Sequence, residues 1–127
     1  MPGGQPLEGL RALVIEDDYF IASDLRSILK VHGANVVRLS GTITDALAEI
    51  RHDGFEFALL DINMRGEFAF LVADEFCRLD IPFAFVSGYD RTHIPPRFSA
   101  IPNWGKPYDD RQIVDGIRRL WTRPVTA

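Results

Sequence analysis

Phe57-Ala58-Leu59-Leu60-Asp61 is an apolar run of strand length that ends on a carboxylate. No polar side chain precedes Asp61 in this run, which is typical of a central strand buried on both faces of a parallel sheet. Three other fragments follow hydrophobic runs and bring polar side chains: Glu16-Asp17-Asp18 after Leu13-Val14-Ile15, the hydroxyl in Phe85-Val86-Ser87-Gly88, and the lysine in Gly105-Lys106-Pro107-Tyr108. Each fragment is a weak signal alone, but their order and spacing indicate one shared site.

Around this run, apolar segments of strand length alternate with segments of helical period. Strands are expected at residues 10–15, 35–39, 57–60, 83–86 and 100–104. Helices are expected between and after them, on apolar stripes that begin at Ile21, Ile43, Leu71 and Ile113. The third stripe is expected to bury Leu71, Val72, Phe76 and Leu79, with Cys77 as core filler.

Prolines restrict the last third of the chain. His93-Ile94-Pro95-Pro96 cannot lie inside a regular helix, so the fourth crossover should be short, irregular or mobile. Pro102 falls within the expected fifth strand and requires an edge position, where a missing N–H is harmless.

The alternation predicts an α/β fold: a doubly wound five-stranded parallel sheet in the flavodoxin-like order 2-1-3-4-5, as a three-layer sandwich with a short or irregular fourth helix. Right-handed crossovers place the carboxyl ends of strands one, three, four and five along one rim, where such sheets bind their ligands. All four polar fragments fall on that rim.

Length and composition narrow the function. The 127 residues fit one domain, expected at 10–122 between a flexible leader (1–9) and a tail (123–127). No apolar stretch approaches the roughly 18 residues of a membrane span, so we expect a cytoplasmic protein with no membrane partner. The net charge of −4 argues against nucleic acid, and Arg118, Arg119 and Arg123 complement the end of a helix. A single cysteine excludes an internal disulfide.

The rim carries the residues that transfer of a phosphoryl group to a carboxylate requires. Asp61 would be the nucleophile, and Glu16 and Asp17 would crowd two further carboxylates beside it. A hard divalent cation relieves their repulsion, and Mg²⁺ suits such oxygen ligands. Asn63, two residues past the nucleophile, is placed to offer its backbone carbonyl to the metal.

Two further groups would handle the phosphoryl group itself. Lys106 would pair with Asp61 at rest and with the phosphoryl group afterwards, and Ser87 would donate to a phosphoryl oxygen. Tyr89, two positions beyond that hydroxyl, is placed to gate water. Each residue has a plainer alternative: Asp18 or Asp17 as a helix cap, Asp61 and Ser87 as turn residues, and Lys106 as a solvated loop lysine.

From about Leu10 to Trp121 the chain resembles a receiver domain of a two-component response regulator. The matching motifs are Val14-Ile15-Glu16-Asp17-Asp18, Leu59-Leu60-Asp61-Ile62-Asn63-Met64, Val86-Ser87-Gly88-Tyr89 and Lys106-Pro107-Tyr108. The resemblance implies Mg²⁺-dependent phosphorylation of Asp61 by a histidine kinase or histidine phosphotransfer protein. It also implies a cis peptide between Lys106 and Pro107 and a conformational change read by a downstream protein partner.

One position departs from most receivers, in which an aromatic residue precedes the lysine by three positions. Here that position is Asn103, and Trp104 should point to the opposite face of the strand. Phe83-Ala84-Phe85-Val86-Ser87-Gly88-Tyr89 instead resembles a stand-alone, often alphaproteobacterial, subclass with a Phe-Ala-Thr-Gly-Tyr-like motif. There, signalling is expected to order the fourth crossover, residues 88–98.

Three function classes remain at this point. The first is a phosphoacceptor module, monomeric or weakly dimeric, whose output is a binding event. The second is a degenerate receiver that binds a partner without phosphorylation. The third is a true enzyme, which is disfavoured because Asn63 stands where an Asp-nucleophile phosphatase would carry its general acid and because no Gly-rich phosphate loop follows the first strand.

Overall fold

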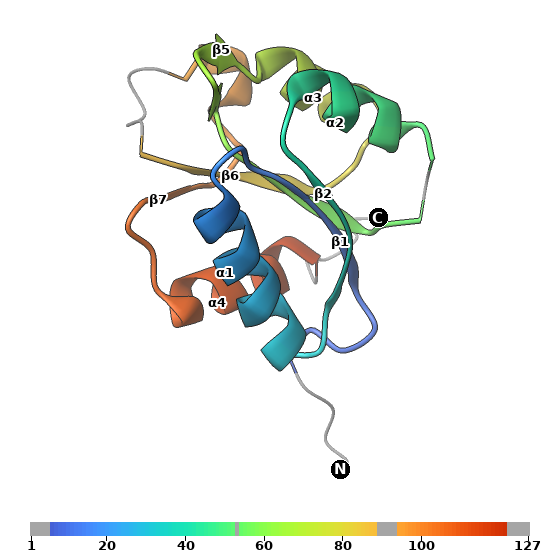
Figure 1. Ribbon diagram of the computed structural model, residues 1–127, viewed down its shortest axis with the longest axis vertical. Helices are drawn as coiled ribbons and strands as arrows, with labels where there is room; N and C mark the ends of the chain where they lie inside the picture. The colour runs from blue at the N-terminus through green and yellow to red at the C-terminus, as the bar shows by residue number, and fades with distance from the viewer. Residues whose placement is uncertain (1–5, 53, 89–93, 122–127) are drawn as a thin grey trace.

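The computed structural model of the chain describes residues 6–52, 54–88 and 94–121. Its central sheet consists of parallel strands β1 (Arg11–Ile15), β2 (Asn35–Ser40), β3 (Phe57–Leu60), β6 (Phe83–Ser87) and β7 (Asn103–Gly105). Their order is β2-β1-β3-β6-β7, which is 2-1-3-4-5 when these strands are counted along the chain. The predicted fold class and strand order are therefore confirmed (Figure 1).

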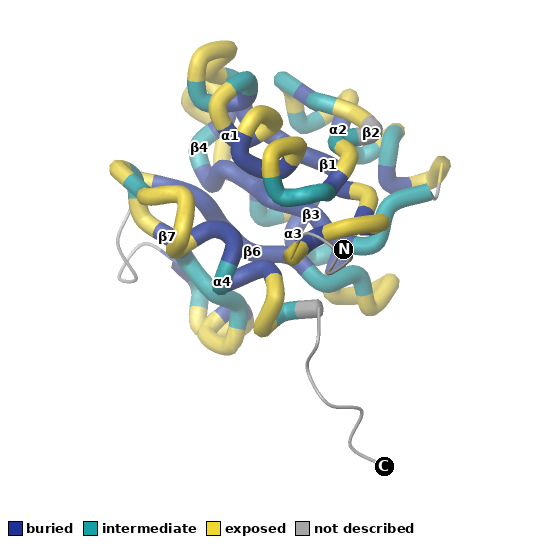
Figure 2. The backbone as a smooth tube through the Cα atoms, turned by 90° about the horizontal axis from the view of Figure 1, so that it is seen from below, coloured by how far each residue is buried: buried dark blue, intermediate teal, exposed yellow. Residues whose placement is uncertain are grey.

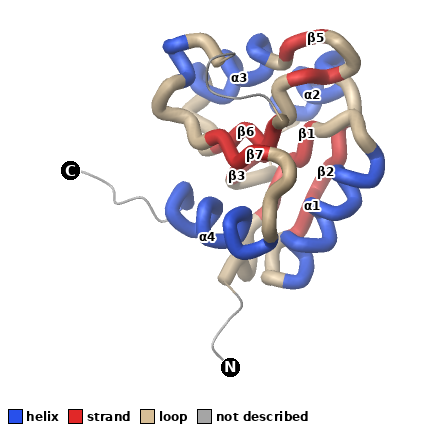
Figure 3. Tube along the Cα trace, turned by 90° about the vertical axis from the view of Figure 1, so that its left-hand side faces the viewer, coloured by secondary structure: helices blue, strands red, loops and turns tan. Residues whose placement is uncertain are grey.

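Helices cover both faces of the sheet. The helices α1 (Tyr19–Val31) and α4 (Asp110–Trp121) lie on one face, and α2 (Ile43–Ile50) and α3 (Phe70–Arg78) lie on the other (Figure 1). Alternate strand residues enter two cores: Val14 and Leu59 face α1 and α4, whereas Leu13 and Leu60 face α2 and α3. The same three layers are visible from the side in Figure 3, and Figure 2 shows the buried strands between exposed helix surfaces.

Side-chain caps start two of the helices as their sequences predict. The carboxylate of Asp18 accepts hydrogen bonds from the N–H groups of Phe20 and Ile21 at the start of α1. The hydroxyl of Thr42 accepts from the N–H of Asp45 at 3.0 Å at the start of α2. The plainer alternative for Asp18, a helix cap, is therefore confirmed.

The fifth strand is shorter than expected. Placing Pro102 inside it was wrong, because β7 begins at Asn103. The carbonyl of Pro102 accepts from the N–H of Phe85 at 2.9 Å, but proline has no N–H to continue a ladder, so it stands just before the strand. The edge position of β7 is confirmed. In the fourth crossover, the described part contains only the 3₁₀ turn η2 (Pro96–Phe98), and residues 89–93 lie outside the described part.

The buried face of α3 differs from the expected stripe. Val72, Ala73 and Phe76 are buried, whereas Leu71 is 66% exposed and Leu79 is 42% exposed. Consecutive helix positions differ by about 100°, so the buried positions Ala69, Val72, Ala73 and Phe76 share one face and Leu71 falls on the opposite one. Cys77 is also exposed, so its assignment as core filler was wrong.

The packed chain begins earlier than the expected boundary at Leu10. Leu7 is fully buried in the core beneath α1 and α4, and its N–H donates to the carbonyl of His32 at 2.8 Å. Of the segment expected as a leader, residues 1–5 lie outside the described part, as does the expected tail. None of the helices in the described part combines the length and apolar character that crossing a bilayer requires.

Candidate functional site

The four polar fragments meet at the carboxyl rim of the sheet because the strand register brings their ends together. Ile15 pairs with Leu60, and Ser87 pairs with Gly105, so the residues that follow β1, β3 and β7 emerge side by side near the end of β6. They border a pocket of about 500 Å³. Its lining residues are Asp17, Asp61, Asn63, Arg65, Gly66, Ser87, Gly88 and Lys106.

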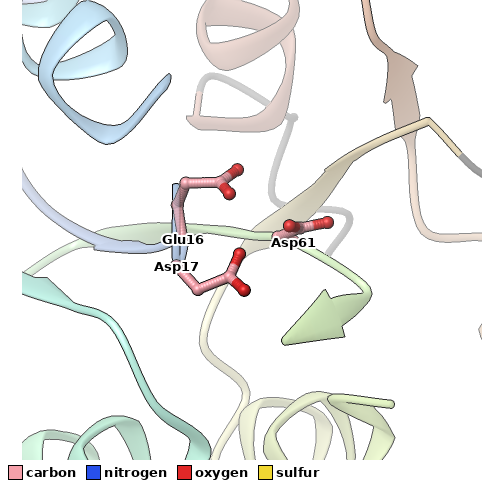
Figure 4. A group of neighbouring side chains, drawn as sticks. All are labelled: Glu16, Asp17 and Asp61. Atoms are coloured by element: carbon pink, nitrogen blue, oxygen red, sulfur yellow. The ribbon is translucent and has the colours of Figure 1, made fainter. Parts of the chain in front are cut away.

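Three carboxylates gather at this rim (Figure 4). Glu16 and Asp17 follow β1 and Asp61 follows β3, and one oxygen from each lies within 4.8 Å of the others. Glu16 is only 5% exposed and Asp61 only 7% exposed. The structure thus brings together the acids that the sequence placed in one pocket.

Lys106 bridges two of these acids. Its ammonium donates to Oε1 of Glu16 at 2.7 Å and to Oδ2 of Asp61 at 3.3 Å. The sequence predicted the contact with Asp61 but not the shorter one with Glu16. Lys106 therefore lines the pocket, with its ammonium paired to buried carboxylates, and is not a solvated loop lysine. The peptide between Lys106 and Pro107 is cis, as the resemblance implied.

Burial changes the proton affinities of this cluster. Burial raises the pKa of Glu16 to about 7, and the nearby charge of Asp61 adds to the shift, although the hydrogen bond from Lys106 opposes it. Burial alone would lower the pKa of Lys106, but its contacts with Glu16 and Asp61 raise it above the usual value. One ammonium cannot neutralise three carboxylates, so the cluster retains uncompensated negative charge.

A small antiparallel hairpin, which the sequence did not predict, closes one side of the pocket. It consists of β4 (Asn63–Met64) and β5 (Glu67–Phe68), joined by Arg65 and Gly66. The N–H of Arg65 donates to Oδ2 of Asp17 at 2.9 Å, which ties the hairpin turn to the acidic cluster. The pattern was missed because two-residue strands carry too little periodicity to be seen.

Asn63 lies at the base of this hairpin. Its N–H donates to Oδ1 of Asp61 at 3.4 Å, and its side-chain oxygen accepts from the N–H of Gly66 at 2.8 Å. The side chain therefore shapes the turn, while the proposed use of its carbonyl by a metal stays a prediction.

Ser87 ends β6 and is 2% exposed in the wall of the pocket. Its backbone carbonyl accepts from the N–H of Lys106 at 3.1 Å, which fixes the lysine segment to the end of β6. The hydroxyl, the lysine and Asp61 thus line one pocket. Tyr89, which the sequence places two positions further on, lies outside the described residues.

The lysine segment holds two further features. Trp104 is 7% exposed and packs in the core beneath α1 and α4, so it does not replace the aromatic residue absent at Asn103. Tyr108 donates its hydroxyl hydrogen bond to Asp24 on α1 at 2.7 Å, a contact that no sequence pattern indicated. Burial and that hydrogen bond raise the pKa of Tyr108 well above its usual value.

The donor set fits a hard divalent cation such as Mg²⁺. Glu16, Asp17 and Asp61 supply oxygen ligands that lie close enough together to share one ion. Among the described residues, no other cluster of three His, Cys, Asp or Glu side chains is close enough to do so.

Comparisons with known proteins give matches among solved structures. The chain is similar to SdrG from Sphingomonas melonis Fr1, with 31% identity over 91% of this chain and 97% of that one, and a TM-score of 0.79. A structure described as the BeF3-activated conformation of SdrG from Pseudomonas melonis Fr1 is 28% identical over 94% of this chain and 98% of that one, with a TM-score of 0.76. The REC domain of the Erythrobacter litoralis PhyR response regulator shares the fold, with 20% identity over 94% of this chain and 97% of that one, and a TM-score of 0.82. No family model matches the sequence, and the comparison with curated proteins found no match.

Proposed function

The chain belongs to the receiver domains of response regulators, and we propose that Asp61 accepts a phosphoryl group from a phosphohistidine donor in a two-component phosphorelay. The donor would be a histidine kinase or a histidine phosphotransfer protein. The output would be binding to a downstream protein, not turnover of a separate substrate. We place the protein in the cytoplasm, as a monomer or weak dimer, with the receiver domain extending to about residue 122.

The observation that carries this proposal is the contact of one ammonium with two buried carboxylates at the rim. The ammonium of Lys106 lies 3.3 Å from Oδ2 of Asp61, on the carboxylate that would carry the phosphoryl group. A cation in this position can follow the negative charge from the carboxylate to the phosphoryl oxygens. The plainer reading of Asp61 as a turn residue does not explain its burial beside Lys106 and Glu16.

The transfer step uses Asp61 as the nucleophile. A carboxylate oxygen attacks phosphorus as the P–N bond of the phosphohistidine breaks, and the imidazole nitrogen takes the bonding electron pair. Lys106 stabilises charge on the phosphoryl oxygens, and the Ser87 hydroxyl donates to one of them. Mg²⁺, held by Glu16, Asp17, Asp61 and the backbone carbonyl of Asn63, would neutralise negative charge and polarise the phosphoryl group.

Phosphorylation would be read out through the fourth crossover. We propose that the Ser87 hydroxyl moves toward the phosphoryl group and that residues 88–98 become ordered around it, although residues 89–93 lie outside the described part. The packing of the 3₁₀ turn on β6 supports this. The rings of Phe98 and Phe85 pack edge-to-face with their centroids 5.8 Å apart, and Phe85 lies two residues before Ser87. Amide exchange across 88–98 should slow when beryllofluoride and Mg²⁺ are added, and unchanged exchange would contradict the read-out.

The acceptor role is tested by incubation with acetyl phosphate and Mg²⁺, followed by intact-mass measurement. The wild-type chain should gain one phosphoryl group, and Asp61→Asn should gain none. Asp18→Asn is a matched control because it changes a neighbouring acid while asparagine keeps the helix cap. Labelling of Asp61→Asn would refute the assignment. A wild-type chain that takes no label would favour the second candidate, a receiver that binds its partner without phosphorylation.

A further inference from the structure

Arg65 occupies a backbone conformation that arginine rarely adopts. It is the first residue of the two-residue turn between β4 and β5, with φ of 56°, and Gly66 follows with φ of 87°. Two positive φ values in such a turn favour Asn-Gly, Asp-Gly or Gly-Gly, because side chains other than Gly, Asn and Asp are strained there. The sequence places a long cationic side chain at this position instead.

Asp80 is the other described non-glycine residue with a positive φ, 58°, and it lies just past the end of α3. Aspartate is one of the few residues that tolerate this conformation, so Asp80 needs no special account. Arginine does not suit a positive φ, so the strain at Arg65 indicates that its side chain has a role at this position.

Arg65 lies where such a side chain would meet a phosphoryl group. It lines the same pocket as Asp61, Ser87 and Lys106, and its N–H is anchored to Oδ2 of Asp17 at 2.9 Å. No carboxylate of residues 6–52, 54–88 and 94–121 forms an ion pair with its guanidinium. The backbone of Arg65 therefore holds this residue at the pocket, and its guanidinium has no carboxylate partner in that part of the chain.

Charge balance indicates when this cation becomes useful. Three carboxylates and the Lys106 ammonium leave two negative charges, which one divalent cation neutralises. Phosphorylation replaces the single charge of Asp61 by the nearly double charge of a phosphoryl group, so about one negative charge is again in excess. A guanidinium can neutralise it and can donate two parallel hydrogen bonds to phosphoryl oxygens from one planar fork, a geometry that an ammonium lacks.

We propose that the guanidinium of Arg65 binds the phosphoryl oxygens on Asp61 and is a phosphoryl-contacting residue of this site. The strained turn positions it, and the bond from its N–H to Asp17 couples the turn to the acidic cluster. Arg65 can act in this way only if Asp61 accepts a phosphoryl group, as proposed above.

The test compares the wild-type chain with Arg65→Asn, Arg65→Lys and the control Arg26→Gln. Asparagine suits the positive φ, so Arg65→Asn should raise the melting temperature by about 3 °C. The same substitution should weaken binding of beryllofluoride in the presence of Mg²⁺ about tenfold, measured by amide NMR titration. Arg65→Lys should show an intermediate loss, because the charge remains but the two-pronged contact does not. Arg26 is exposed on α1 and does not line the pocket, so Arg26→Gln should bind as the wild type does.

Opposite changes in stability and binding separate this role from a structural one. A structural arginine would lower the melting temperature when replaced, and that result would overturn the proposal. Unchanged beryllofluoride affinity in Arg65→Asn would also overturn it, provided that the wild-type chain binds beryllofluoride and takes label from acetyl phosphate. If the wild type does neither, the acceptor role of Asp61 fails first, and the role of Arg65 fails with it.

Discussion

The ammonium of Lys106 lies closer to Glu16, at 2.7 Å, than to the proposed phosphoacceptor Asp61. Lys106 and Glu16 are 90 positions apart in the sequence and follow the carboxyl ends of β7 and β1. Glu16 is 2% exposed at its side chain, so this is a nearly buried ion pair. Removal of the lysine should therefore cost more than removal of a cation from a surface pair, because it leaves buried carboxylates without their cation.

Replacing Lys106 by methionine should lower the free energy of unfolding by about 2 kcal/mol at pH 8, because Glu16 and Asp61 lose their shared cation. Lys106→Arg is the matched control, since it keeps the charge, and it should lose less. Urea unfolding without divalent cations measures both variants. A methionine variant as stable as the wild type at pH 8 would mean that the ion pair makes no net contribution.

The raised pKa of Glu16 predicts an unusual dependence of stability on pH. The folded chain keeps a proton on Glu16 up to about pH 7, whereas the unfolded chain releases it near pH 4.5. The folded state binds more protons between these values, so the free energy of unfolding should fall as pH rises through this window. The contribution should be about 1 to 3 kcal/mol in the absence of Mg²⁺.

The measurement is the difference between wild type and Glu16→Gln in urea unfolding from pH 4 to 9 with EDTA present. The difference isolates Glu16 from other groups, such as Glu56, whose pKa is lowered by its hydrogen bond with Arg11. Glu16→Gln should be the more stable variant at pH 8, and Mg²⁺ should narrow the gap. A difference that does not change with pH would contradict the pKa assigned to Glu16.

Sequence patterns predicted the features that depend on long runs or on fold geometry. The run from Phe57 to Leu60 forms β3 with the expected bounds, because four consecutive apolar residues suit a central strand that is buried on both faces. The rim site followed from parallel strand order, which brings residues after β1, β3, β6 and β7 together whatever their separation in sequence.

Features that depend on a single contact could not be predicted in this way. The pairing of Lys106 with Glu16 is decided by side-chain reach within the pocket, and the exposure of Leu71 by which face of α3 packs on the sheet. The turn at Arg65 was missed because its residue type argues against the conformation that it adopts. These departures from local preference lie mostly at the site, where function competes with stability.

Gly116 in α4 should not tolerate alanine. A Cβ there would lie 2.3 Å from Cζ2 of Trp104, a ring that is almost fully buried. Glycine to alanine normally stabilises a helix by up to about 1 kcal/mol, but this clash should reverse the sign and cost about 1 to 3 kcal/mol.

Gly41→Ala is the control for that substitution, because the nearest atom to its added Cβ lies at 4.0 Å. It should change stability by less than about 0.5 kcal/mol. Thermal unfolding of both variants checks the comparison. A Gly116→Ala variant that is more stable than the wild type would contradict close packing of Trp104 against α4.

Two aromatic side chains at the start of α1 should matter only when the phosphodonor is a protein. Tyr19 is 74% exposed and Phe20 82% exposed, directly after the acidic cluster, and exposed aromatic groups often mark contact surfaces. A protein that brings a phosphohistidine to Asp61 must cover this region.

Phe20→Ala should therefore slow transfer from such a donor about fivefold or more, while labelling by acetyl phosphate stays unchanged. Leu71→Ala is the control, because Leu71 is also an exposed apolar side chain, at 66%, but belongs to α3 on the other face of the sheet, and it should affect neither rate. Equal slowing with both donors in Phe20→Ala would show that the ring supports the pocket itself and not the docking of the donor.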